Sequence, residues 1–222
     1  MRIDPYLIKR LPKYSPKRVL YTGWARLSDH CSSYFYEEYK LPIKLLVDLP
    51  DAPPACWKET QVLAQQTQYL LWALRETESI DGCVVEVGAW RGVTTAILAA
   101  NTTSTVVAID PWIGSSNEVN LASFLSRTES LSNVAHERKS FGLAVREWNH
   151  GPVRFIFIDA AHDYANVAHD IAAARPLVSP GGMIALHDTD NKRFPGCRRA
   201  VYEVAEHYKL IAHVDNLTVL MV

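Results

Sequence analysis

The stretch CVVEVGAWRGVTTAILAAN, residues 83–101, joins an apolar segment to a helical pattern through a turn that contains glycine. CVVEV (83–87) is short, apolar and rich in valine, which predicts a buried strand. Gly88 and Gly92 mark the turn, and the apolar residues of 90–101 recur at helical spacing. A strand that passes through a glycine turn into a helix is typical of the first unit of an open α/β sheet.

Further strand–helix pairs follow this unit along the chain. We expect strands at 105–110, 134–140, 153–159 and 182–188, and helices near 118–130, up to Trp148, at 164–178 and at 196–208. Residues 209–222 predict two strands around the turn Asp215-Asn216. Apolar strands alternating with helices predict an α/β fold: a doubly wound, mostly parallel sheet with helices on both faces and one antiparallel strand.

Residues 1–56 differ in composition from the rest of the chain. They are rich in proline and aromatic residues, and proline fixes φ and lacks an N–H donor, so we expect no long regular element there. We assign 1–56 as an N-terminal extension that serves as a lid, or as a substrate or oligomer segment, and 57–222 as the main domain. A helix is expected from Trp57 to about Thr77.

Composition narrows the class of protein. The 222 residues are 48% hydrophobic and 21% charged, which suits one domain with a substantial core. The net charge of −1 gives no case for binding nucleic acid. Four scattered cysteines indicate reduced thiols, and no apolar run reaches the roughly 18 residues of a membrane span or marks a signal peptide. We therefore expect a cytoplasmic protein.

Two acids end successive strands near the glycine turn. Glu86 lies at the end of the first strand, and Asp110 follows Gly88 by 22 residues. An acid about 20 residues past such a turn grips the ribose hydroxyls of a bound nucleotide. The dinucleotide pattern G-x-G-x-x-G is absent, so a nucleoside ligand without a pyrophosphate fits better. S-adenosylmethionine meets this requirement, with its ribose on Asp110 and its amino-acid end near Glu86 and Gly88; a strand–helix connection without a ligand is the alternative.

EVGAWRG (86–92), VVAIDPW (106–112) and LVSPGGMIALHD (177–188) resemble motifs of the class I S-adenosylmethionine-dependent methyltransferases, over roughly residues 80–222. The resemblance implies the sheet order 3-2-1-4-5-7-6 with strand 7 antiparallel. It also implies that Gly92 belongs to the cofactor turn and that Ser140 lies near the adenine. Trp112 either lies on the adenine or caps the sheet edge, and a serine such as Ser140 is also an ordinary helix N-cap.

A second pair of acids ends the two following strands. FIFIDAAHDY (155–164) carries Asp159 at the strand end and His162 three residues later, and Asp188 ends the next strand. Two carboxylates that converge at neighbouring strand tips need a proton or a cation between them, and a divalent ion such as Mg²⁺ is one solution. His162 has a pKa suited to a general base; a helix-start histidine bonded to the backbone is the alternative.

This second pair resembles the site of catechol and caffeoyl-CoA O-methyltransferases. There the acid is a metal ligand and a lysine three residues later is the base, which His162 replaces here. Their Asp-Asn metal pair corresponds to Asp188-Thr189, where threonine is a poorer ligand that Asp190 or Asn191 could replace. FIDAAHDY, ALHD and PGCRRAVYEV resemble more closely a small-molecule group that includes macrolide-sugar O-methyltransferases, often magnesium-dependent.

The resemblance implies an O-methyltransferase of natural product biosynthesis that acts on a hydroxyl of a small metabolite or sugar. The acceptor pocket is expected from 1–56 and the loop 189–197. His187 is expected to point to the opposite side of its strand from Asp188, as a packed core histidine. Alternatives are a metal-independent methyltransferase, a nucleotide-binding oxidoreductase and a non-catalytic binding module. We expect no nucleic-acid or membrane partner, and a homo-oligomer if the aromatic N-terminal segment needs a partner surface.

Overall fold

A computed structural model describes residues 5–9, 11–53, 59–113 and 115–222. The helices are α1 (Pro5–Lys9), α2 (Pro16–Tyr34), α3 (Ala64–Glu76), α4 (Val93–Ala100), α5 (Ser115–Thr128), α6 (Phe141–Arg146), α7 (Tyr164–Ala174) and α8 (Pro195–Ala205), with a 3-10 turn η1 (Tyr36–Glu38). The strands are β1 (Cys83–Val87), β2 (Val106–Ile109), β3 (Val134–Glu137), β4 (Val153–Ile158), β5 (Val178–Leu186), β6 (Lys209–Val214) and β7 (Leu217–Met221).

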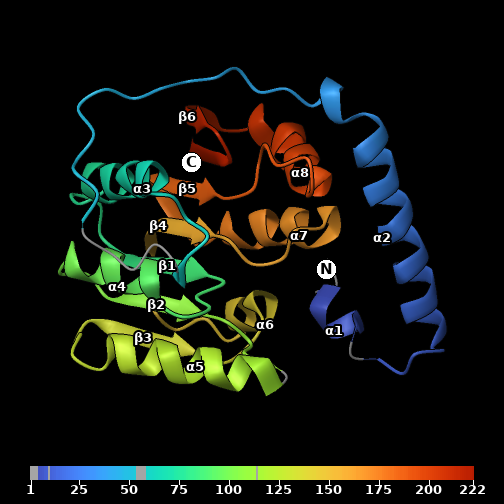
Figure 1. The fold of residues 1–222 in the computed structure, drawn as a ribbon, viewed down its shortest axis with the longest axis horizontal. Helices are drawn as coiled ribbons and strands as arrows, with labels where there is room; N and C mark the ends of the chain where they lie inside the picture. The colour runs from blue at the N-terminus through green and yellow to red at the C-terminus, as the bar shows by residue number, and fades with distance from the viewer. Residues whose placement is uncertain (1–4, 10, 54–58, 114) are drawn as a thin grey trace.

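The strands form one seven-stranded sheet in the order β3-β2-β1-β4-β5-β7-β6 (Figure 1). β1 to β5 pair in parallel, whereas β7 is antiparallel to both β5 and β6. The predicted doubly wound fold, its strand order and the closing hairpin are therefore confirmed. Parallel β1 and β4 run at the centre with every residue buried, because helices cover both faces of the sheet.

Alternate residues of the central strands fill two separate cores. Val84 and Phe155 pack with α3 and α4 on one face of the sheet. Val85 and Ile156 pack with α6, α7 and α8 on the other face. The two-residue side-chain period of a strand produces this division, and it leaves the strand ends free to carry polar groups.

Helix α2 corrects the expectation that residues 1–56 hold no long regular element. It spans 19 residues, because the prolines of this segment lie outside its interior. Pro16 occupies the first turn, where its missing N–H is not needed, and the Ser15 side chain accepts a hydrogen bond from the Arg18 N–H at 3.3 Å. α2 packs against α7 and α8, where Asp29 accepts a hydrogen bond from the Tyr164 N–H at 3.1 Å (Figure 1).

The segment after α2 crosses the molecule to reach α3. Lys44 pairs with His213 of β6 through two backbone hydrogen bonds of 3.0 and 2.9 Å, so this segment lies along the β6 edge of the sheet. Helix α3 begins at Ala64 rather than near Trp57, and Trp57 itself lies outside the described residues. Gln66 fixes this start, since its Oε1 accepts the Leu63 N–H at 2.8 Å.

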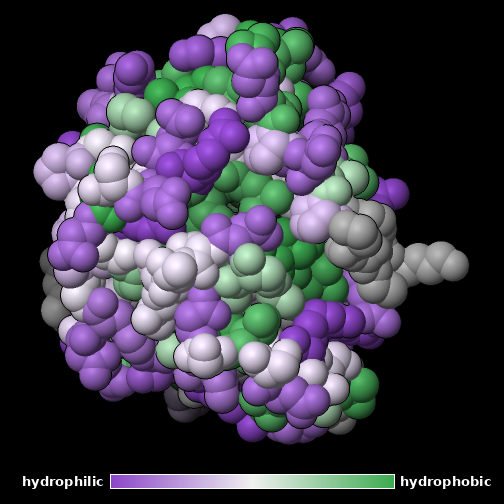
Figure 2. Space-filling model, turned by 90° about the vertical axis from the view of Figure 1, so that its left-hand side faces the viewer, coloured by the Kyte–Doolittle hydropathy of each residue, from purple (hydrophilic) through white to green (hydrophobic). Residues whose placement is uncertain are grey.

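Figure 2 shows the side of the molecule where α3 and α4 lie. Hydrophilic side chains cover most of this side, and hydrophobic ones gather around a hollow near its centre. Among the helices that the structure describes, none is both long enough and apolar enough to cross a membrane.

Candidate active site

A cavity of about 750 Å³ opens beyond the carboxyl ends of β1, β2, β4 and β5. Seven of the predicted cofactor, metal and catalytic residues line it: Glu86, Gly88, Asp110, Ser140, Asp159, His162 and Asp188. Gly92 and Trp112 are not among the described residues that line it. The cavity therefore sits where ligands bind in open α/β sheets, at the point where β1 neighbours both β2 and β4.

Gly88 shapes the floor of this cavity. Its φ is +96°, in the region that favours glycine, and a Cβ there would overlap the backbone carbonyl of Asp159. The absent side chain lets the turn after β1 approach the end of β4. Gly92 has φ +77° at the start of α4, and a Cβ there would lie 2.8 Å from the Phe124 ring, so its role is to pack α4 against α5.

Glu86 and Asp110 place two carboxyl groups at one end of the cavity. Glu86 is only 2% exposed and accepts a hydrogen bond from the Thr95 hydroxyl. Burial raises the pKa of Glu86 to about 8, and the charges of Asp159 and Asp110 add to the shift. Asp110 accepts the backbone N–H groups of Trp90 at 3.0 Å and Trp112 at 2.8 Å, which fixes its carboxylate at the tip of β2.

Trp112 is 1% exposed, and its indole packs beside Phe124 with ring centroids 4.9 Å apart. The indole N–H donates to the Trp90 carbonyl at 2.7 Å. Of the two interpretations of this residue, the packed loop aromatic matches its position, and the structure does not bring it to the cavity. Ser140 occupies the N-cap position of α6 and lines the cavity as well.

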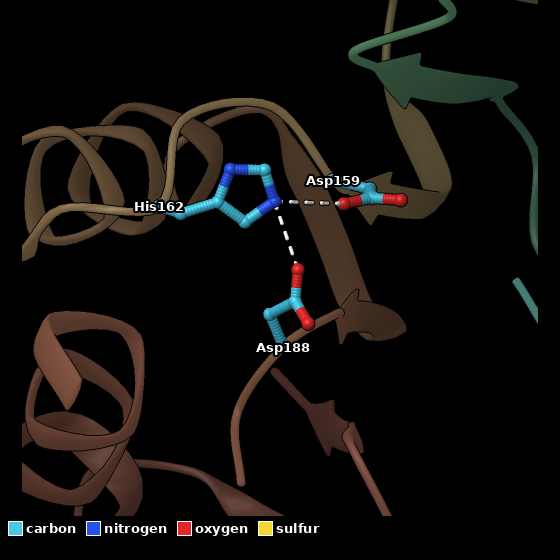
Figure 3. A group of neighbouring side chains, drawn as sticks. All are labelled: Asp159, His162 and Asp188. Carbon is cyan, nitrogen blue, oxygen red and sulfur yellow. Dashed lines mark ion pairs between the residues drawn. The ribbon is translucent and has the colours of Figure 1, made fainter. Parts of the chain in front are cut away.

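Asp159, His162 and Asp188 meet at the ends of β4 and β5 (Figure 3). His162 Nε2 lies 2.8 Å from Asp188 Oδ2 and 3.5 Å from Asp159 Oδ1. One ligand atom from each residue lies within 4.8 Å of the others. His162 projects from the loop before α7, and its ring stacks on Phe194 with centroids 4.3 Å apart. The arrangement can hold a cation or a proton between its carboxylates.

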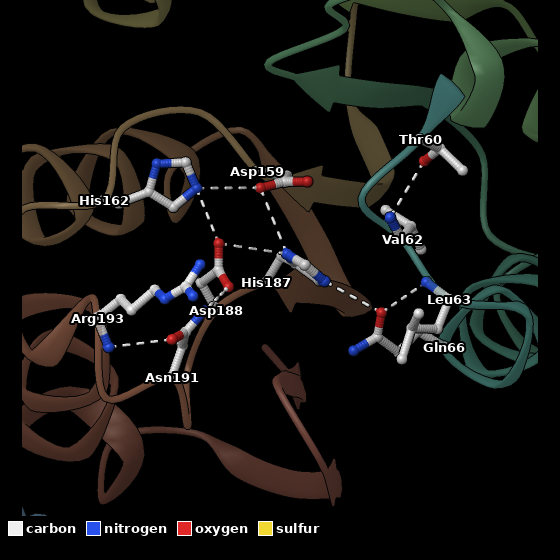
Figure 4. A network of polar contacts seen from close by, with 10 residues as sticks. All are labelled: Thr60, Val62, Leu63, Gln66, Asp159, His162, His187, Asp188, Asn191 and Arg193. Atoms are coloured by element: carbon white, nitrogen blue, oxygen red, sulfur yellow. Dashed lines mark hydrogen bonds and ion pairs between the residues drawn. The ribbon is translucent and has the colours of Figure 1, made fainter. Parts of the chain in front are cut away.

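His187 belongs to the same group, and the expectation that it faces away from Asp188 is wrong. Its Nδ1 lies 3.5 Å from Asp159 Oδ1 and 3.5 Å from Asp188 Oδ2, and its Nε2 lies 3.1 Å from Gln66 Oε1 (Figure 4). Alternation of side chains holds only within a strand, and β5 ends at Leu186. Asp188 then adopts φ +56°, which turns its carboxylate back toward His187.

The charges of this group depend on one another. Burial lowers the pKa of both His162 and His187, but the neighbouring carboxylates outweigh burial and raise each pKa to about 9. Burial likewise raises the pKa of Asp159 and Asp188, and the two histidines reverse that effect, so both carboxyl pKa values lie below the usual range. At neutral pH, protonated histidines therefore balance two ionised carboxylates when no metal is bound.

The residues after Asp188 were candidates for completing a metal site. The Thr189 hydroxyl hydrogen-bonds to that of Thr218 at 2.7 Å and is buried there. Asp190 accepts the Tyr36 hydroxyl at 3.0 Å and pairs with Arg198. Asn191 Nδ2 donates to Asp188 Oδ1 at 2.8 Å, so of these three it is the residue in contact with the group.

The sequence interpretation missed His187 and Gln66. The sequence does carry a pattern that could have identified His187, because this histidine directly precedes an acid at a strand end in ALHD. The pattern that could have identified Gln66 is weaker: it is a glutamine within the apolar stripe of α3. It is 1% exposed and joins α3 to the group at β4 and β5 (Figure 4). Asp163 is the N-cap of α7 and accepts the Asn166 N–H at 3.0 Å.

Residues 85–189 match the sequence model of a family described as "Methyltransferase domain". This region contains the glycine turn, Asp110 and the whole acid–histidine group. The central part of the chain is thus similar to a methyltransferase domain, and its sheet has the strand order expected from the resemblance to the class I S-adenosylmethionine-dependent methyltransferases. No curated protein matches the chain.

Solved structures share the fold at low sequence identity. The O-methyltransferase NovP is 16% identical, with TM-score 0.61 over 73% of this chain and 81% of that one. The O-methyltransferase TomG of Streptomyces achromogenes, solved with SAM and involved in tomaymycin synthesis, is 16% identical, with TM-score 0.57 over 99% and 95%. CalS11, a TDP-rhamnose 3'-O-methyltransferase of calicheamicin biosynthesis, is 17% identical, with TM-score 0.55 over 93% and 95%.

Proposed function

We propose that this protein is an S-adenosylmethionine-dependent O-methyltransferase that acts on a hydroxyl group of a small metabolite or sugar. One observation carries the proposal: Asp159, His162 and Asp188 stand in the same cavity as the glycine turn and Asp110. A donor held at the turn and an acceptor hydroxyl held by the acid–histidine group would then share one enclosed space, which favours transfer by proximity.

The cofactor end of the cavity suits S-adenosylmethionine. Asp110 would hold the ribose hydroxyls, Glu86 and Gly88 would lie toward the amino-acid end, and Ser140 toward the adenine. TomG was solved with SAM, and an O-methyltransferase of Bacillus cereus with SAH, on the same fold. The absence of a dinucleotide pattern in EVGAWRG (86–92) argues against the oxidoreductase alternative.

Asp159 and Asp188 would hold a divalent ion such as Mg²⁺. The fit rests on the donor set, because two carboxylates face one point and the buried His187 Nδ1 faces it as well. When bound, S-adenosylmethionine supplies an activated methyl group, and the ion supplies a Lewis acid that lowers the pKa of a coordinated hydroxyl. With the Asp188 carboxylate on the ion instead of on His162, Nε2 would be free to accept the hydroxyl proton, while the Phe194 ring keeps the imidazole in place.

Natural-product and sugar hydroxyls are the acceptors that the neighbours suggest. CalS11 is described as methylating the 3'-hydroxyl of TDP-rhamnose, and TomG as taking part in tomaymycin synthesis. Arg193, Asn191 and Phe194 line the cavity beside Asp188, on the loop expected to contact the acceptor. We assign the acceptor to this side, between that loop and residues 59–63.

Calorimetry with S-adenosylhomocysteine and with NAD tests the cofactor. We expect micromolar binding of the former and none of the latter, and binding of NAD alone would refute the proposal. Methyl transfer to a panel of sugar nucleotides and phenols, with and without EDTA, tests the metal. If activity survives complete chelation, the metal part of the proposal is wrong and the methyltransferase part still holds, as in the metal-independent alternative.

We also propose that a second copy of this chain covers the outer face of α2. Leu20, Leu27 and Tyr34 recur every seven residues along it and are 74%, 63% and 78% exposed. Lys13 and Lys17 lie at one end of this stripe, and Glu37 and Glu38 follow the other end. Two antiparallel copies would bring basic ends against acidic ends, with Leu27 near the two-fold axis.

A further inference from the structure

We propose that His187 is the third protein ligand of the metal, through Nδ1, and that the site therefore takes a divalent transition ion in preference to Mg²⁺. This inference rests on the metal part of the proposed function and goes beyond it, because it adds a nitrogen ligand and changes the class of ion. His162 is left free to act as the base.

The atom that carries the inference is buried and unsatisfied. The His187 side chain is 4% exposed, and its Nδ1 has no hydrogen-bond partner among the described residues. Its neighbours are the two carboxylate oxygens at 3.5 Å. Buried polar atoms are almost always satisfied, so an orphan atom aimed at two carboxylates needs a positive charge between them: a proton on Nδ1 in the metal-free protein, and a metal ion in its place when one is bound.

Gln66 decides which nitrogen of His187 carries the proton. A backbone N–H can only donate, so the Gln66 atom 2.8 Å from the Leu63 nitrogen must be the amide oxygen. The same oxygen lies 3.1 Å from His187 Nε2, which must therefore donate to it. In the neutral imidazole, Nδ1 is then the nitrogen with the lone pair, and that lone pair faces Asp159 and Asp188.

A metal-bound histidine needs this arrangement. Ligating histidines usually donate their second N–H to a protein oxygen, which fixes the tautomer and the ring. Ligand atoms about 2.1 Å from one ion lie about 3.0 to 3.4 Å apart, close to the separations of His187 Nδ1 from the two carboxylate oxygens. One ion between these three atoms would satisfy all of them.

His162 is the weaker candidate for this ligand. It lies on a loop rather than at a strand end, its side chain is 34% exposed, and it already contacts Asp188 Oδ2 at 2.8 Å. Figure 4 shows the two imidazoles approaching the carboxylates from different sides, with Gln66 behind His187 alone. His187 can thus bind the ion while His162 accepts the proton.

The ligand set determines the class of ion. Carboxylate and water oxygens suit both Mg²⁺ and Mn²⁺, whereas imidazole nitrogen suits Fe²⁺, Ni²⁺ and Zn²⁺; of the first two ions, the transition ion Mn²⁺ accepts a nitrogen ligand more readily. Two carboxylates with one imidazole leave open positions for water or an acceptor hydroxyl. We therefore expect the protein to bind Mn²⁺ about tenfold or more tightly than Mg²⁺.

Pulsed electron paramagnetic resonance on the full chain loaded with Mn²⁺ alone tests the inference. The wild type should show coupling to a directly bound nitrogen, and ¹⁵N-histidine labelling should change its frequencies. His187→Asp keeps a charged oxygen ligand and should retain bound Mn²⁺ without nitrogen coupling, while lowering the Mn²⁺/Mg²⁺ affinity ratio about tenfold. His162→Gln should keep the coupling, as should His213→Gln, which alters a buried histidine bonded to Thr218 instead.

Three results would overturn the inference: no Mn²⁺ binding, bound Mn²⁺ without nitrogen coupling, or coupling lost in His162→Gln and kept in His187→Asp. In the first case a proton on Nδ1, rather than a metal, satisfies His187. Binding of S-adenosylhomocysteine, measured on each variant, shows whether the variant is folded. Methyl transfer measured in EDTA separates the two proposals, because it can persist when the metal ligand assignment fails. If His187→Asp does not fold, the labelled wild type and His162→Gln still decide the ligand.

Discussion

The Asp159 carbonyl occupies the space that a side chain on Gly88 would need. This contact joins the turn after β1 to the end of β4, and so sets the distance between the glycine turn and the acid–histidine group. Both sides of this contact are backbone atoms, so no flexible side chain can move aside to make room for a Cβ at Gly88. It makes Gly88 a requirement of the site as well as of the turn.

Gly88→Ala should therefore destabilise the protein by about 3 kcal/mol or more, because it combines an unfavourable φ with a backbone clash. Gly151→Ala is the matched control: its φ of +79° is also positive, but a Cβ there meets nothing within 4 Å. It should cost about 1 kcal/mol, from φ alone. Urea denaturation measures both values, and equal costs would show that the Asp159 contact does not constrain the turn.

His162→Ala tests the base. We expect kcat to fall about 10²- to 10⁴-fold, because the variant lacks the group that accepts the hydroxyl proton. The Kd for S-adenosylhomocysteine should stay within about twofold, since the glycine turn and Asp110 are unchanged. His207→Ala, at an exposed histidine of the chain, is the control for both constants. Turnover near that of the wild type would remove His162 from the mechanism.

Most of the fold could be predicted from the sequence because it depends on local patterns. The apolar strands, their helices and the hairpin at Asp215-Asn216 appear close to the expected positions, although α7 ends at Ala174 and β5 spans Val178–Leu186 rather than 182–188. Helix α2 could not be predicted by counting prolines, since the effect of a proline depends on its position. Pro16 begins the helix rather than breaking it.

The candidate site was predictable where it depends on strand ends. Asp159 and Asp188 follow neighbouring parallel strands, so topology alone brings them together. His187 depends instead on where β5 ends and on the left-handed backbone of Asp188, which no periodicity encodes. Trp112 similarly has φ +38°, a left-handed conformation that the sequence pattern does not predict.

Glu86→Gln tests the buried carboxyl through pH. Folding raises the pKa of Glu86 from 4.5 to about 8, so the folded state holds the proton more tightly than the unfolded state. The contribution of Glu86 to the free energy of unfolding is neutral below pH 4.5. It becomes increasingly destabilising as the pH rises toward about 8, by at most roughly 5 kcal/mol. The Glu86→Gln variant should lose this part of the pH dependence of the free energy of unfolding. Denaturation from pH 5 to 8 in EDTA measures it, and parallel curves for the two proteins would contradict the raised pKa.

Leu27→Glu tests whether a second copy covers α2. Two charges near the two-fold axis would repel each other in an apolar contact, so a dimer should dissociate at least tenfold more readily. Val119→Glu on α5 is the control, because Val119 is also 63% exposed and lies away from the stripe. Sedimentation velocity measures the dissociation, and Leu27→Cys should form a disulfide between copies under mild oxidation if Leu27 lies near the axis. A wild type that is monomeric at high concentration, or a dimer that Leu27→Glu leaves intact, would exclude this face as the interface.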